Sequence, residues 1–219
     1  MERMIVLNQK AYFNHLKDVY EFEEALENYK DRIVVLPSFI YMSSYINRGF
    51  TVGAQNVSDV DFGPFTGEVT ISSLKDIGVK YVLIGHSEVR DRYLNENELI
   101  RKKISKALEN DLKVILCIGE KRGEDVFKII DECTYDIPKS VIISYEPIWS
   151  IGSDDIPSVR FIDDVVSYVK NKGFSKVLYG GSVNEKNIDV LGKSNVDGYL
   201  VGSASKSTQS IVKLIEVVK

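Results

Sequence analysis

The chain has 219 residues and a formal net charge of -4, from 28 basic and 32 acidic side chains. Hydrophobic residues make up 44% and charged residues 27%, the composition of an ordinary globular protein with a sizeable core. No basic run carries interleaved aromatic residues, and no apolar stretch approaches the length of a membrane span. We therefore expect no nucleic-acid partner and no membrane partner.

Residues 1–219 are expected to form a single domain in the cytoplasm. The apolar run near the N-terminus is too short for a signal peptide. The two cysteines, Cys117 and Cys133, make no disulfide framework, and neither belongs to a Cys-x-x-Cys pair.

Short apolar runs alternate with helical patterns along the whole chain. The expected strands cover residues 4–8, 33–37, 51–55, 81–85, 113–118, 141–145, 176–180 and 198–201. The expected helices cover residues 18–29, 39–47, 72–77, 96–109, 124–133, 158–170, 185–191 and 205–218. These are strand–helix units in strict alternation, without a linker or a low-complexity stretch.

Two architectures accommodate this alternation: an open doubly wound sheet and a closed eight-stranded barrel. Polar candidate residues stand at the ends of the first, fourth, sixth, seventh and eighth strands. In an open sheet those ends would spread over several strand spacings of about 4.8 Å each, whereas in a barrel they converge at one mouth. The sequence therefore favours the α/β class with an eight-stranded parallel (β/α)8 barrel. The chain is short beside the roughly 250 residues typical of this fold.

The first and fourth strands end in polar motifs. In LNQK, Asn8 and Lys10 point to the same side if the strand persists, and the ammonium group could stabilise a developing oxyanion. In IGHSEVR, His86 precedes a stretch that is expected to be a polar loop. The other histidine, His15, lies in a polar stretch with no candidate partner. Taken alone, each of these residues is more often structural than catalytic.

The sixth strand leads into YEPIWSIGS. Glu146 ends the strand, Pro147 prevents its continuation, and Trp149 lies among large apolar residues. Large apolar groups on a loop are costly in water unless the loop closes onto something, so this segment indicates a base with a lid. The last two strands end in LYGGSV and VDGYLVGSAS, and paired glycine-rich turns there are the usual phosphate site of this barrel.

These motifs, in this order from Asn8 to Ser203, closely resemble triosephosphate isomerase. The resemblance implies a barrel enzyme that needs no cofactor and no metal. Glu146 would be the base, and His86 the neutral electrophile. That family is itself the known example in which a glutamate base works with a neutral histidine. Lys10 and Asn8 would complete the catalytic set.

The resemblance also implies supporting roles for other residues. Ser87 would open the turn beyond His86 and offer an N–H that keeps the imidazole neutral. Glu88 would pair with Lys10, and Cys117 would pack beneath Glu146 rather than act as a nucleophile. Backbone N–H groups would hold the substrate phosphate, from Gly152, Gly181, Ser182, Gly202 and Ser203. The loop of residues 56–69 would reach a partner subunit through Thr66, which predicts a homodimer.

The chain departs from the family pattern at several positions, which are Gln9, Val89, Asn95, Asp154 and Ser203. Gln9 is interpreted as a packing difference, and Val89 lies near the expected subunit contact. The departures at Asn95, Asp154 and Ser203 keep open the alternative of a catalytically weak paralogue that binds phosphate as a sensor or assembly factor. A class I aldolase would need a Schiff-base lysine, and only Lys10 stands at a suitable strand end. A metal-dependent enzyme would need clustered ligands, and a single strand-end histidine argues against one.

Overall fold

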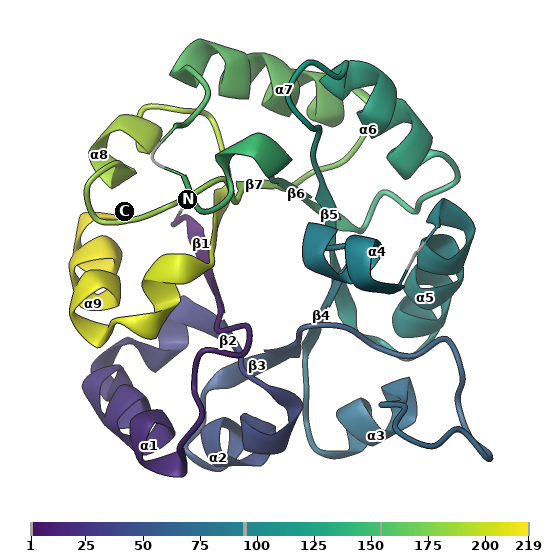
Figure 1. The fold of residues 1–219 in the computed structure, drawn as a ribbon, viewed down its shortest axis with the longest axis vertical. Helices are drawn as coiled ribbons and strands as arrows, with labels where there is room; N and C mark the ends of the chain where they lie inside the picture. The colour runs from purple at the N-terminus through teal and green to yellow at the C-terminus, as the bar shows by residue number, and fades with distance from the viewer. Residues whose placement is uncertain (1, 94–95, 154, 219) are drawn as a thin grey trace.

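Eight parallel strands form a closed barrel in which each strand pairs with the next and β8 pairs with β1 (Figure 1). The computed structural model describes residues 2–93, 96–153 and 155–218. The strands are β1 Met4–Asn8, β2 Ile33–Leu36, β3 Thr51–Ala54, β4 Tyr81–Ile84, β5 Lys113–Ile118, β6 Ile142–Tyr145, β7 Val177–Tyr179 and β8 Gly198–Val201. The predicted (β/α)8 barrel is confirmed, and each strand end lies within one residue of its expected place.

The helices surround this barrel as an outer ring (Figure 1). They are α1 Leu16–Ala25, α2 Met42–Asn47, α3 Ile71–Asp76, α4 Ser87–Tyr93, α5 Asn97–Glu109, α6 Val126–Thr134, α7 Val159–Asn171, α8 Ile188–Leu191 and α9 Thr208–Val217. Four 3-10 turns accompany them: η1 Glu27–Arg32, η2 Phe39–Tyr41, η3 Ile148–Ser150 and η4 Ser203–Lys206. In the described ranges, no helix is both long and apolar enough to cross a bilayer.

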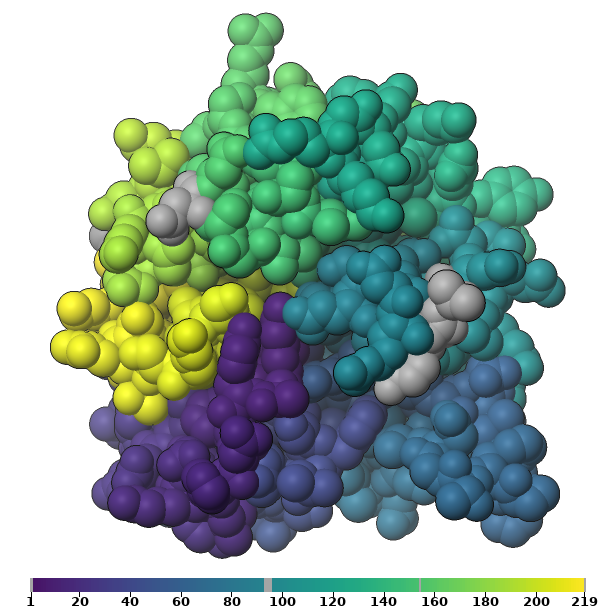
Figure 2. Space-filling view, viewed as in Figure 1, coloured from purple at the N-terminus to yellow at the C-terminus, as the bar shows by residue number. Residues whose placement is uncertain are grey.

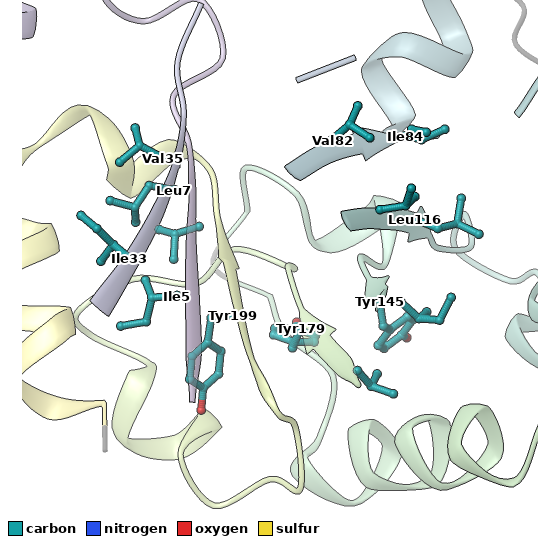
Figure 3. Packing of buried hydrophobic residues seen from close by; sticks show 14 of the residues in the cluster. Ile5, Leu7, Ile33, Val35, Val82, Ile84, Leu116, Tyr145, Tyr179 and Tyr199 are labelled. Atoms are coloured by element: carbon teal, nitrogen blue, oxygen red, sulfur yellow. The ribbon is translucent and has the colours of Figure 1, made fainter. Parts of the chain in front are cut away.

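The core has two layers because strand side chains alternate between the two faces of the barrel wall. Ile5 and Leu7 of β1 face the helices, together with Tyr145, Tyr179 and other large side chains (Figure 3). The barrel interior is filled by a second set, Val6, Val34, Leu36, Leu83, Ile115, Cys117, Ile142, Leu178 and Leu200. The same alternation carries Asn8 and Glu146 to the inside, at the carboxyl ends of β1 and β6.

One expected element was wrong. The stretch after His86 is the helix α4 and not a polar loop. Its first turn carries Glu88 and its last turn carries Arg90 and Arg92, so its charges complement the helix dipole although it lacks an apolar stripe.

The helix expected at residues 185–191 begins only at Ile188. The side chain of Asn184 accepts a hydrogen bond from the Lys186 N–H at 2.9 Å, and the side chain of Asn187 accepts one from the Asn184 N–H at 3.0 Å. Such local bonds satisfy backbone N–H groups outside a helix, so they delay its start.

Candidate active site

One small cavity at the mouth of the barrel is lined by residues from five strand ends. Asn8 ends β1 and Lys10 follows it, His86 follows β4 and Glu146 follows β6. The remaining lining residues come from the lid and the last two turns, and are Ile151, Gly152, Gly180, Ser182, Leu200, Gly202 and Ser203. The cavity measures about 20 Å³, little more than one water molecule needs. Figure 2 shows why: the green lid, the teal α4 and the purple chain after β1 meet over the centre of this face.

The carboxylate and the imidazole face each other inside this cavity. Glu146 Oε2 lies 3.4 Å from His86 Nε2, and both residues are about 95% buried. On the other side of the ring, His86 Nδ1 accepts a hydrogen bond from the backbone N–H of Glu88 at 3.3 Å. Because Nδ1 is an acceptor, the neutral ring carries its proton on Nε2, where it points into the cavity.

The N–H that bonds His86 was expected from Ser87, and that expectation was wrong. The donor is one residue further on, because α4 begins at Ser87 and its first free N–H groups point back along the helix axis at the imidazole.

Lys10 reaches the cavity by leaving the strand. It has a φ of 50°, a left-handed conformation that is uncommon for a residue with a side chain, so the strand does not persist to Lys10. The turn is held because Asn8 Oδ1 accepts the Lys10 N–H at 3.1 Å. Gln55 Nε2 donates to the Lys10 carbonyl at 2.8 Å. The ammonium group lies 2.6 Å from Glu88, the partner expected for it.

The turns after β7 and β8 place backbone close to these side chains. A Cβ added to Gly202 would lie 3.3 Å from Lys10 Cε, and one added to Gly181 would lie 2.4 Å from the Tyr179 hydroxyl. Ser182 has a φ of 51°, whereas Ser203 has a negative φ, which suits a residue with a Cβ. Within the described ranges, no residue accepts a hydrogen bond from the N–H of Gly181, Ser182 or Gly202. These donors are therefore available to an anion.

The family model for triosephosphate isomerase matches residues 3–218. The chain belongs to the triosephosphate isomerase family. A triosephosphate isomerase of Finegoldia magna is 42% identical over 77% of this chain and 77% of its own. That of Buchnera aphidicola subsp. Baizongia pistaciae is 37% identical over 84% of this chain and 83% of its own. That of Malacoplasma penetrans is 34% identical over 99% of both chains.

The lid of this family member lies over the site. Its apolar residues Ile148, Trp149 and Ile151 are half-buried, and Ser182 Oγ donates to the Ser150 carbonyl at 2.5 Å. Gly152, with a φ of 73°, forms the exposed tip.

Glu120 anchors the first arm of the lid, a role that the sequence did not reveal. Its Oε1 accepts the Trp149 indole N–H at 2.7 Å and the Tyr145 hydroxyl at 3.2 Å. The side chain is buried, and this burial raises the pKa of Glu120.

Two positions at which the sequence departs from the family pattern, Asn95 and Asp154, lie outside the described residues.

Cys117 lies beneath the base, as a buried thiol on the inner face of β5. Burial, followed by the charge of Glu146, raises the pKa of the Cys117 thiol. A thiol with a raised pKa is a poor nucleophile, which suits the packing role inferred from the sequence.

Two glycines that the sequence did not mark as site residues make room for Glu146. A Cβ on Gly119 would lie 1.7 Å from the Glu146 carbonyl oxygen, and a Cβ on Gly180 would lie 2.5 Å from Glu146 Cγ. Both glycines stand where the sequence shows only a strand followed by a turn. The sequence does not reveal either contact with Glu146, because each contact joins the ends of two different strands.

Replacing Gly180 with Ala should push the Glu146 side chain away from its position. We expect kcat to fall by about 10- to 100-fold, because a displacement of about 1 Å in a reacting group costs that much. Steady-state kinetics measures the loss, and circular dichroism shows whether the barrel is intact. A folded Gly180→Ala protein with unchanged kcat would show that this contact does not set the position of the base.

Thr66 is not among the residues that line the cavity, and it belongs to the exposed segment between β3 and α3. That segment projects from the barrel (Figure 1). The same segment carries Phe62, which is 94% exposed, and Phe65, which is 45% exposed. Within its own chain, Thr66 therefore takes no part in the site.

Proposed function

We propose that this chain is a triosephosphate isomerase that interconverts dihydroxyacetone phosphate and D-glyceraldehyde 3-phosphate through an enediolate, the reaction used in glycolysis and gluconeogenesis. One observation carries the proposal. A buried carboxylate, Glu146, faces Nε2 of His86, whose Nδ1 accepts a backbone N–H, in a cavity that is also lined by Lys10 and glycine-rich turns.

The chemistry follows from these groups. Glu146 takes a proton from the carbon next to the substrate carbonyl, and the electron pair of that C–H bond forms the C=C bond of the enediolate. The carbonyl oxygen gains the negative charge, which His86 Nε2–H and the Lys10 ammonium stabilise. The hydroxyl proton on the deprotonated carbon then passes to the former carbonyl oxygen, a transfer that His86 Nε2 can relay. Glu146 delivers its proton to the former carbonyl carbon, so that the carbonyl and hydroxyl groups exchange places and no atom is lost.

The phosphate of the substrate would lie against the turns after β7 and β8. Free N–H groups of Gly181, Ser182 and Gly202 point to an anion, with Ser203 and the lid residue Gly152 beside them. Since the cavity measures about 20 Å³ in this conformation, a triose phosphate can enter only when the lid moves. Closure afterwards excludes water and retains the reactive enediolate.

A coupled isomerase assay on the purified protein, in both directions, tests this function. We expect turnover of both triose phosphates. A folded protein that binds phosphate but does not turn over either substrate would support the paralogue with a sensor or assembly role, which no structural observation favours.

We also propose a homodimer in the cytoplasm. The exposed side chains of Phe62 and Phe65 precede Thr66 on a projecting loop, and exposed apolar groups of this size suit burial against a second copy. Cys117 and Cys133 are both free thiols, which is in keeping with a reducing compartment.

Light scattering should give the mass of a dimer, and the Thr66→Arg variant should be mostly monomeric with strongly reduced activity. Tyr135→Arg serves as a control, because Tyr135 is 72% exposed and follows α6 rather than lying on the projecting loop. A fully active monomer at assay concentration would contradict the dimer.

A further inference from the structure

The loop between β5 and α6 contacts the lid through a side chain that the mechanism above does not use. Arg122 Nη2 lies 2.6 Å from Asp155 Oδ2, and Arg122 Cζ lies 4.8 Å from the centre of the Trp149 ring. Trp149 precedes the lid tip at Gly152 and Asp155 follows it. One guanidinium group thus contacts both arms of the lid.

The loop presents Arg122 in a fixed position. The Glu124 N–H donates to the Lys121 carbonyl at 3.1 Å, and the Lys121 N–H donates to Glu124 Oε2 at 2.7 Å. Gly123 has a φ of 89°, which this turn needs at its third position. Arg122 therefore stands at the second position of a closed turn, with its side chain directed at the lid.

The two contacts suit the chemistry of arginine. A guanidinium group is planar and delocalised, so its face can stack on an indole while its N–H groups donate to a carboxylate in the same plane. The same loop contributes Glu120, which accepts the Trp149 indole N–H at 2.7 Å. The first arm of the lid therefore contacts two residues of one loop. The second arm contacts the same loop through Asp155, whose carbonyl also accepts the Ser150 hydroxyl at 2.7 Å.

We propose that Arg122 is a positioning residue that holds the lid over the active site, by stacking on Trp149 and pairing with Asp155. The proposal rests on the proposed function and adds a determinant of lid closure to it. Arg122 touches no reacting group, so its loss should act through the population of the closed lid. Both contacts are partly exposed to water, and each is expected to shift this population by only a few-fold.

The test compares Arg122→Gln, Arg122→Lys and Asp155→Asn, with Lys121→Gln as the control. Lys121→Gln removes the same charge from the neighbouring exposed residue. Arg122→Gln should lower kcat/KM and weaken binding of 2-phosphoglycolate, a planar mimic of the enediolate, by about 5- to 10-fold. Asp155→Asn and Arg122→Lys should each cause a part of this loss, because each retains one of the two contacts.

Fluorescence gives a reading that does not depend on turnover, because Trp149 is the only tryptophan in the chain. Arg122→Gln should shift the emission of the ligand-free protein to longer wavelength, whereas Lys121→Gln should leave it unchanged. If Arg122→Gln matches Lys121→Gln in emission and in 2-phosphoglycolate affinity, the proposal is overturned. If the proposed function fails instead, the parent protein will show no turnover of either triose phosphate. The emission shift of Arg122→Gln would still test the contacts of Arg122 in that case.

Discussion

Glu146→Asp is expected to slow isomerisation by about 100- to 1,000-fold. Removal of one methylene withdraws the carboxylate from the carbon that it must deprotonate, and positioning and general-base catalysis contribute effects of that size. Glu146 is held at a fixed place, since its N–H donates to the Ile118 carbonyl at 2.8 Å and glycines face its backbone and Cγ. The shorter aspartate side chain could bring its carboxylate back to the substrate carbon only if β6 moved.

Binding should change far less than turnover in this variant. Asp keeps the charge, and the phosphate contacts lie on the turns after β7 and β8. We therefore expect 2-phosphoglycolate to bind Glu146→Asp within about 10-fold of the parent, while kcat falls much further. Near-normal turnover of Glu146→Asp would remove Glu146 from the role of the base. Equal losses in kcat and in affinity would indicate a damaged site rather than a displaced base.

The barrel could be predicted because most of the strands are short, mainly apolar runs that are buried on both faces. Val6, Val34 and Ile142 fill the interior, and their neighbours in sequence face the helices. Polar side chains at the carboxyl ends of such strands must converge once the barrel closes. The convergence of Asn8 and Glu146 therefore depends only on the alternation of side chains and on closure.

The features that the sequence did not reveal depend on contacts between distant segments. Glu120 is one of many carboxylates in the chain, and only the fold shows that it lies beneath Trp149. A glycine such as Gly180 indicates that another group packs closely against the backbone, but the sequence does not show that this group is the Glu146 side chain. The donor to His86 could be placed correctly only if α4 were recognised. The signal available for that was the charge pattern of this segment, with Glu88 in the first turn and arginines in the last.

His86→Ala is expected to lower kcat by about 100- to 1,000-fold, the cost of removing one donor to a developing oxyanion. The imidazole is held as a donor because Nδ1 accepts the Glu88 N–H, so Nε2–H is already aimed into the cavity before substrate binds. Alanine removes this donor and leaves the Lys10 ammonium to stabilise the enediolate alone. Glu146 would also lose its neighbour at 3.4 Å.

The other histidine provides a matched control for this variant. His15 is exposed and its side chain does not cap α1, so His15→Ala should retain full turnover. His86→Gln should be more active than His86→Ala, since its amide can still donate a hydrogen bond into the cavity. The loss should appear in kcat and much less in the affinity for inorganic phosphate, which is held by the turns after β7 and β8. If His86→Ala and His15→Ala turn over equally, the developing charge is stabilised by Lys10 and the backbone, and the imidazole has only a packing role.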